Sequence, residues 1–191
     1  LSFDEKGKSE KKKYWDPLQD KELTNTGNIN KVLAKTIEES IRYRGISDVD
    51  VGVFLSGGID SSTNAYFFSK NSKKKIKTFS IGYDQEYKSY KSELNYARIV
   101  AKHIKSSHFE KKLSKDDIKN FIFDMVYFQD EPISDPVCVP IFYVSKLARE
   151  KNIRVCQVGE GADELFFGYT NWLRTSRIDS LLNNNFFPKF L

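Results

Sequence analysis

The sequence of 191 residues is poor in sulfur and imidazole side chains, with two cysteines, one methionine and two histidines. Two cysteines, Cys138 and Cys156, cannot build a disulfide framework and lack the spacing of a metal site. His103 and His108 have no further ligand residues at metal-binding spacing, so we interpret them as surface or packing residues. These shortages argue against a disulfide-stabilised secreted protein and against a structural metal protein.

Long apolar runs are also missing. No stretch approaches the roughly 20 apolar residues that a membrane span needs, and no secretory leader is visible. We therefore expect a cytoplasmic protein without membrane contact. Because the chain begins at Leu1 and not at methionine, we also expect it to be a part of a longer protein.

Neither sign of charge dominates, since 31 basic residues face 26 acidic ones and leave a net charge of +5. Much of the excess lies in two lysine-rich runs, Lys6 to Lys13 and Lys73 to Lys77, which we interpret as solvated surface. No basic stripe interleaved with aromatic residues occurs outside these runs, so we predict no nucleic-acid partner. The length suits one domain with its own core.

Strand and helix patterns alternate along the chain. Residues 1–28 are polar and lysine-rich without periodicity, which predicts a linker or entry segment before a domain at 29–191. Apolar runs predict strands at 51–55, 76–83, 108–113 and 153–158. Helical spacing predicts helices at 29–44, 61–69, 94–104 and 118–128, and a further helix that follows the loop 131–140 and ends at about residue 151. This order predicts the α/β class: an open, mostly parallel, Rossmann-like sheet with helices on both faces.

Two short runs carry the chemistry: Ser56–Ser62 (SGGIDSS) and Gly159–Glu164 (GEGADE). Each comes after a predicted strand and opens a predicted helix. The first run does not have the spacing of GxxxxGK[ST] or GxGxxG, which indicates a different phosphate-binding loop. Since ligands of parallel α/β sheets bind at the carboxyl ends of the strands, we expect the two runs to form two halves of one pocket.

The first run suits a polyphosphate. Gly57 and Gly58 have no side chains to hold a phosphate away, the helix start offers free N–H groups, and Ser56 and Ser61 add hydroxyl donors. Asp60 would repel a polyphosphate unless a cation lay between them, and Mg²⁺ prefers such oxygen ligands. The alternative for Asp60 is a helix-capping side chain.

The second run adds acids. Asp163, at another predicted helix start, could give the same metal a second carboxylate. Glu160 lies between two glycines, where a desolvated carboxylate could accept a proton near neutral pH. The alternative for Glu160 is an exposed turn residue. We interpret Glu164 as a first-turn acid that favours the helix dipole.

The run from Val53 to Ser62 closely resembles the SGGxDS pyrophosphate loop of the ATP pyrophosphatase superfamily, and Gly159–Tyr169 (GEGADELFFGY) resembles a run of glutamine-hydrolysing asparagine synthetases. Thr78–Gly82 resembles the second-strand nucleotide contact of that family. The resemblance implies an adenine nucleotide alpha hydrolase-like fold. It also implies that ATP and Mg²⁺ adenylate the side-chain carboxylate of aspartate, and that ammonia from glutamine displaces AMP to give asparagine.

Residue roles are implied by the same resemblance. Ser56 to Ser61 would hold the pyrophosphate, Asp60 and Asp163 would bind Mg²⁺, and Glu160 would be the acid–base residue. The adenosine site would be lined by Leu55, Ile81, Val158 and Gly159.

The chain departs from the family at several points. Val158 stands where the family often has serine, and Phe167 replaces a usual glycine, which we expect to alter helix packing only. The family's active-site lysine falls beyond Leu191, and no glutaminase domain with its N-terminal cysteine precedes residue 29. We therefore expect a glutaminase domain in the full-length protein and no asparagine formation by this chain alone.

Three functions remain open from the residues, and the first is the glutamine-dependent asparagine synthetase that the resemblance implies. A related amidotransferase or a β-lactam synthetase-like enzyme would use the same loops with another carboxylate acceptor, because the loops handle ATP and not the acceptor. A non-catalytic nucleotide-binding module is the third, although it would have little need for Asp60, Glu160 and Asp163 together. The residues identify neither the acceptor nor the oligomeric state, with a homodimer among the options.

Overall fold

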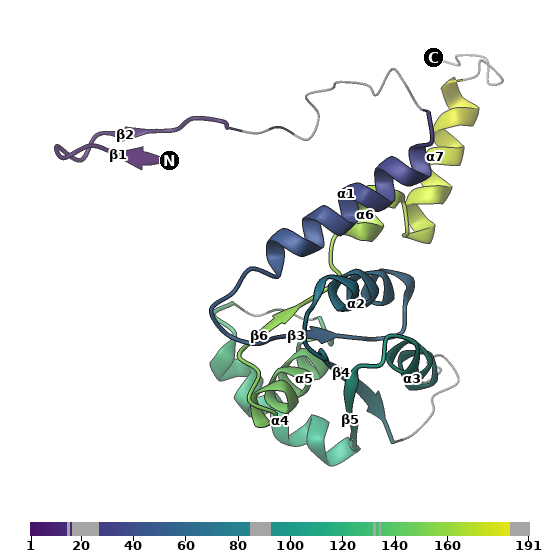
Figure 1. The fold of residues 1–191 in the computed structure, drawn as a ribbon. Helices are drawn as coiled ribbons and strands as arrows, with labels where there is room; N and C mark the ends of the chain where they lie inside the picture. The colour runs from purple at the N-terminus through teal and green to yellow at the C-terminus, as the bar shows by residue number, and fades with distance from the viewer. Residues whose placement is uncertain (15, 17–26, 85–92, 132, 134, 184–191) are drawn as a thin grey trace. The chain divides into compact units, whose positions relative to one another are not determined.

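The computed structural model describes residues 1–14, 16, 27–84, 93–131, 133 and 135–183 (Figure 1). The chain separates into two compact units, Leu1–Thr36 and Ile37–Leu191. The boundary between them falls inside helix α1 (Ile29–Arg44), which ends just before Gly45, where the helical spacing predicts its end. The domain start predicted at residue 29 stays a prediction.

The first unit contains a short hairpin in the segment whose composition predicts a linker. Strands β1 (Ser2–Phe3) and β2 (Ser9–Glu10) pair antiparallel. Between them, the carboxylate of Asp4 accepts hydrogen bonds from the N–H groups of Lys6 and Lys8, at 3.0 and 2.8 Å. Strands of two residues carry no alternating pattern, which is why polarity and periodicity do not predict this hairpin.

The second unit is built on a parallel sheet. Within the described residues its strands are β3 (Val51–Phe54), β4 (Lys77–Tyr83), β5 (Ser107–Leu113) and β6 (Val155–Gln157). Their order is β5-β4-β3-β6, and every neighbouring pair is parallel. The predicted fold class is therefore confirmed.

Helices cover both faces of this sheet (Figure 1). On one face, α2 (Ile59–Asn71), α3 (Leu94–His103) and residues 37–44 of α1 pack on β3. On the other face lie α4 (Lys115–Phe128) and α5 (Cys138–Glu150). Among the described helices, each is too short or too polar to cross a membrane.

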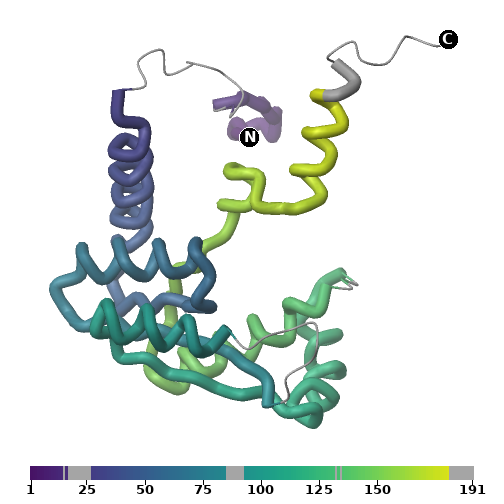
Figure 2. The backbone as a smooth tube through the Cα atoms, turned by 90° about the vertical axis from the view of Figure 1, so that its right-hand side faces the viewer, coloured from purple at the N-terminus to yellow at the C-terminus, as the bar shows by residue number. Residues whose placement is uncertain are grey.

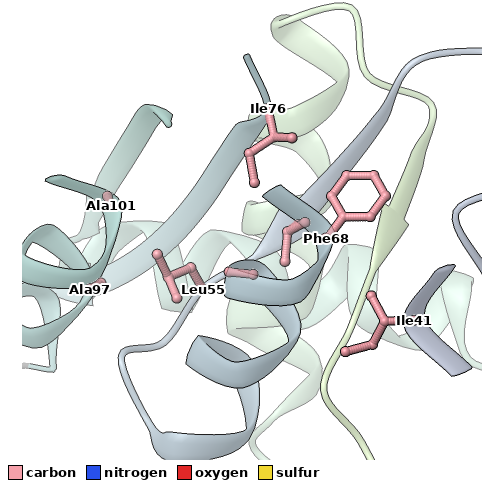
Figure 3. Close-up of a cluster of buried hydrophobic side chains, with 8 residues drawn as sticks. Ile41, Leu55, Phe68, Ile76, Ala97 and Ala101 are labelled. Carbon is pink, nitrogen blue, oxygen red and sulfur yellow. The ribbon is translucent and has the colours of Figure 1, made fainter. Parts of the chain in front are cut away.

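The core on the first face surrounds the strand that leads into the SGGIDSS loop. Leu55, which is 1% exposed, shares a cluster with Phe68 of α2 and Ala97 of α3 (Figure 3). Burying a leucine side chain contributes about 1.5–3 kcal/mol. The small side chains of Ala97 and Ala101 belong to the same cluster and allow α3 to approach the sheet closely. The end of β3 is thus fixed before the loop begins.

The core on the second face centres on Phe79 of β4, which is fully buried. Val144, Leu147 and Ala148 of α5 pack against it. The start of α4 has a capping box, which the sequence Ser114–Asp117 (SKDD) resembles: the N–H of Asp117 donates to Ser114 Oγ, and the Asp117 carboxylate accepts from the N–H of Ser114.

Several elements differ in extent from the prediction, and three of these differences bear on the site or the sheet edge. Strand β5, predicted over 108–113, begins one residue earlier and pairs with β4 along its whole length, Ser107–Leu113. Strand β6 is shorter than the predicted 153–158. Helix α2 begins at Ile59, two positions before the predicted start at Ser61, so Asp60 lies in its first turn. An acid in the first turn is favourable because it faces the positive end of the helix dipole, which is consistent with the earlier start.

The sheet order places a topological switch between β3 and β6. The chain passes from β3 to β4 to β5 in one direction and then returns through α4 and α5 to the opposite side of β3. The two crossovers diverge at the carboxyl ends of β3 and β6, which is where ligands bind in open α/β sheets. Both sequence runs begin at this edge.

The edge strand β5 is tied to α3 by a charged network. Arg98 donates to both carboxylate oxygens of Glu110, at 2.9 and 2.7 Å. His108 Nδ1 lies 2.9 Å from Thr78 Oγ1, and its Nε2 lies 3.0 Å from Glu110 without hydrogen-bond geometry. Burial lowers the pKa of His108 and outweighs the raising effect of Glu110.

The lowered pKa of His108 predicts a pH-dependent stability. In the unfolded chain a histidine has a pKa of about 6.5. It therefore binds a proton more readily than His108 does in the folded chain, where the pKa is lowered. The free energy of unfolding should therefore fall as pH drops below that value. Urea unfolding at pH 7.5 and 5.5 measures the loss, which should shrink in His108→Gln. The exposed His103→Gln is the control, and an unchanged pH slope in His108→Gln would contradict the assignment.

Candidate functional site

The SGGIDSS loop is closed by its own hydrogen bonds. Ser56 Oγ lies 2.9 Å from Ser61 Oγ and accepts from the N–H of Gly58 at 3.1 Å. The N–H of Ser56 donates to Ser61 Oγ, which in turn donates to the carbonyl of Gly58, both at 3.2 Å. These bonds fold the loop back on the first turn of α2.

Gly57 is the tightest point of the loop. Its φ is +95°, a conformation that side chains with a Cβ rarely adopt. A Cβ at this position would lie 2.6 Å from the backbone nitrogen of Ala97 and 2.7 Å from Tyr96 Cβ. Only glycine therefore fits between the loop and α3. The contact with Tyr96 and Ala97 is not visible in the sequence, although the double glycine signals a close approach.

The start of α2 offers an anion-binding surface. Gly58 is the N-cap residue and makes no side-chain cap. In the part of the chain that the structure describes, the N–H groups of Ile59, Asp60 and Ser61 have no hydrogen-bond acceptor. Free N–H groups and the helix dipole both favour an anion at this point. Asp60 is half-buried in the same turn.

The residue before the loop is held by β4. The N–H of Leu55 donates to the Phe79 carbonyl at 2.8 Å, and the Ser80 hydroxyl donates to the carbonyl of Leu55. The Leu55 side chain belongs to the core, so only its backbone can face a ligand. Ser80, a buried hydroxyl in the strand KTFSIGY, therefore positions the loop. In the sequence, the only sign of this role is that Ser80 is a polar residue within a largely apolar strand.

The second loop meets the first at Gly159. A Cβ on Gly159 would lie 3.0 Å from the backbone nitrogen of Ser61 and 3.1 Å from the carbonyl carbon of Asp60. The two loops therefore touch at the first turn of α2, as their positions after parallel strands predict. Gln157, at the end of β6, is buried and donates to the Ile41 carbonyl at 3.1 Å, which anchors β6 below this contact.

Beyond Gly159 the chain turns into α6 (Ala162–Phe166) and α7 (Thr170–Asn183), the green-to-yellow end of the tube in Figure 2. Gly161 begins α6 with φ +87° and Phe167 ends it with φ +56°. A glycine would adopt this last conformation without strain, whereas a side chain costs about 1–2 kcal/mol there. The consequence of Phe167 is therefore backbone strain and not only the altered packing that we expected.

Asp163 lies against the backbone at the end of α6. Its carboxylate oxygen Oδ1 lies 1.7 Å from where a Cβ of Gly168 would be, and its carbonyl accepts from the N–H of Gly168 at 2.9 Å. A glycine at 168 is therefore required for this turn.

A hydrogen bond in the second loop shifts the pKa values of Tyr169 and Glu164. The Tyr169 hydroxyl donates to the Glu164 carboxylate at 2.7 Å. This bond, together with smaller contributions that include the charges of Asp163 and Glu160, raises the pKa of Tyr169 to about 12. The same bond lowers the pKa of Glu164. Glu164 thus holds Tyr169, a role that the helix-dipole interpretation did not include.

The remaining predicted site residues, Val158, Ile81 and Glu160, differ in how far they are exposed to solvent. Val158 is 48% exposed, whereas Ile81 is half-buried and packs with the clusters under α4 and α5. Glu160 is exposed and not desolvated, contrary to the condition set for a proton acceptor. The neighbouring helices leave it open, because α6 has no buried residue and residues 170–180 are all exposed.

The oxygen donors of the two loops are compatible with Mg²⁺. The described residues contain no cluster of three or more His, Cys, Asp or Glu side chains that could hold a metal. Mg²⁺ does not need one, since it is commonly bound by one or two carboxylates together with substrate phosphates and water. Asp60 beside the free N–H groups of α2 fits that pattern. A metal shared by Asp60 and Asp163 stays a prediction.

This arrangement defines a class: a parallel α/β domain with a glycine-rich loop and a helix start at the topological switch of its sheet. The family model described as Asparagine synthase matches residues 32–187. The chain therefore belongs to the asparagine synthase family.

Curated relatives agree. The chain is 39% identical over 138 residues to a putative glutamine-hydrolysing asparagine synthetase of Mycobacterium tuberculosis H37Rv, covering 72% of this chain and 20% of the relative. It is 33% identical over 193 residues to a Methanocaldococcus jannaschii counterpart, covering 100% of this chain and 36% of that protein. For asparagine synthetase 1 of Bacillus subtilis the identity is 36%, with coverage of 76% and 22%. The chain thus spans about a fifth to a third of these relatives' lengths.

A solved structure is also similar: the ammonia-dependent NAD synthetase of Campylobacter jejuni, in complex with nitrate. The identity is 16%, the TM-score is 0.47, and the match covers 73% of this chain and 60% of that one.

The contact at Gly159 predicts the effect of a single methyl group. In Gly159→Ala the new Cβ would press on backbone atoms of Asp60 and Ser61, which cannot move aside as a side chain can. We expect a loss of about 1–3 kcal/mol in the free energy of unfolding, as for other overpacked sites, measured by urea denaturation. NMR amide shifts should change over residues 56–62. Gly27→Ala, where nothing lies within 4 Å, is the control, and an equal response of both variants would refute the contact.

Proposed function

We propose that this chain is the nucleotide-binding core of a glutamine-dependent asparagine synthetase. In this function a carboxylate oxygen of aspartate attacks the α-phosphorus of ATP and releases pyrophosphate. Ammonia derived from glutamine then attacks the acyl carbon, and AMP leaves with formation of asparagine. Membership of the asparagine synthase family supports this proposal, and the observation that carries it is the contact of Gly159 with the backbone of Asp60 and Ser61.

The first loop would hold the pyrophosphate part of ATP. The free N–H groups at the start of α2 would donate to phosphate oxygens, and the hydroxyls of Ser56 and Ser61 would join them by exchanging their present hydrogen bonds within the loop for bonds to phosphate. The adenosine would lie near Val158 and Gly159, with the backbone of Leu55 and the side chain of Ile81 below it. Preorganised donors of this kind stabilise the charge that develops on the leaving group.

Asp60 and Asp163 would hold Mg²⁺. The ion would neutralise charge on the phosphates, which a lone carboxylate beside them cannot do. Asp60 is suited to this role because it lies in the same helical turn as the free N–H groups.

Glu160 would act as the acid–base residue. It is exposed in the described chain, so this role requires other parts of the full-length protein to enclose it. Enclosure would also exclude water from the acyl-adenylate, which hydrolyses readily. We therefore expect this chain to bind nucleotide and to form no asparagine by itself.

Replacing Asp60 tests the metal role. In Asp60→Asn, Mg-ATP affinity should fall about tenfold or more, the loss typical of one charged ligand contact, because the phosphates lose their bridging cation. Isothermal titration of the purified chain with ATP, with and without Mg²⁺, measures the change. Asp116→Asn removes the same charge from the first turn of α4 and should leave affinity unchanged. Equal Mg-ATP affinity in Asp60→Asn and the parent chain would favour a non-catalytic module.

The acceptor is tested in the full-length protein. Aspartate should stimulate ATP–pyrophosphate exchange, because adenylation of its carboxylate is reversible. Glutamate and other carboxylic acids serve as comparison acceptors. Stimulation by another acid in place of aspartate would assign the protein to a related amidotransferase.

A further inference from the structure

We propose that the opposite edge of the sheet carries a second ligand site, for a small anion with an apolar body. A cavity of about 330 Å³ opens at this edge, within the unit Ile37–Leu191. It lies between the end of α1, the end of α2 and the start of β3. Its existence does not depend on the proposed function.

The floor of the cavity is apolar. Phe68, Ile76 and Ile153 are each less than 10% exposed, and Val51 lies beside them. Gly45 leaves the space open, because a Cβ there would lie 2.9 Å from the Phe68 ring. An apolar group of a ligand would therefore contact packed side chains and not water.

The rim of the cavity is cationic. Five basic side chains face one carboxylate, that of Asp50: Arg42, Lys73, Lys74, Lys75 and Lys77.

Only some of these cations are engaged. Lys74 lies 3.4 Å from Asp50, Lys77 donates to the Lys151 carbonyl at 2.9 Å, and Arg42 lies over the Tyr43 ring. For Lys73 and Lys75 there is no hydrogen bond or ion pair with any residue in the described part of the chain.

Helix dipoles account for only part of this charge. Helices α1 and α2 both end at this edge, and each carboxyl-terminal end carries about half a negative charge. Together they offset roughly one cation, whereas Asp50 offsets one more. A net positive rim remains. A bare phosphate would leave the apolar floor unused, and a neutral apolar ligand would leave the cations unpaired, so the cavity suits a molecule with both features.

The cavity is separate from the nucleotide loops. It is lined by Val51 and Lys77, the first residues of β3 and β4. The SGGIDSS loop comes after the other end of β3, across the whole sheet. A ligand here would therefore bind without competing with ATP.

NMR titration of the purified, isotopically labelled chain with phenylphosphonate tests the site. Amide shifts should appear at Gly45 and over residues 71–76. Methylphosphonate carries the charge without the ring, and benzyl alcohol carries the ring without the charge; both should bind more weakly. Lys73→Gln combined with Lys75→Gln should weaken phenylphosphonate binding roughly five- to tenfold, the size expected for two exposed charge contacts.

The matched control combines Lys112→Gln with Lys115→Gln, two exposed lysines outside the cavity lining. It should bind phenylphosphonate as the parent chain does. All four lysines are exposed, so both variants should keep the dispersed spectrum of the folded chain. Shifts confined to residues 56–62, equal binding of methylphosphonate, or equal losses in the two variants would overturn the proposal.

Discussion

The close backbone approach between Gly159 and the first turn of α2 is the constraint on which the site depends. It requires that β3 and β6 be neighbours and parallel, so that their carboxyl ends reach one edge. It also requires glycine at two points, since a Cβ on Gly57 would meet α3 and one on Gly159 would meet Asp60 and Ser61. The loops are consequently positioned by packing of main chain on main chain, and the Ser56 and Ser61 hydroxyls close the first loop by their own hydrogen bonds.

Much of this could be predicted from the sequence, because it rests on local signals. Apolar runs indicated the strands, helical spacing indicated α1 and α3, and the double glycine of the first loop indicated a tight turn beside a helix start. The capping box at Ser114 was also visible. The alternation of strands and helices made the class of fold predictable. It does not determine the whole sheet order, because the place of β6 beside β3 depends on long-range packing.

The remainder could not be predicted because it depends on contacts distant in sequence. The Leu55 side chain points into the core, which the apolar run alone does not distinguish from a ligand-facing position. The role of Ser80 requires knowing that β4 lies beside β3. Phe167 takes a left-handed conformation that its residue type disfavours, and the exposure of Glu160 depends on the segments that cover it.

Exposure of the second loop limits the chemistry that the described residues can perform. The first loop is held in shape by the hydrogen bonds between Ser56 and Ser61. The acids of the second loop are not enclosed, and large apolar side chains such as Leu165 and Phe166 stand in solvent beside them. Exposed apolar groups of this size are unfavourable in water and usually mark a surface that another part of a protein covers. The N–H donors of the first loop are thus built into the carboxyl edge of the sheet, whereas the acid Glu160 of the second loop stays open to solvent in the described part of the chain.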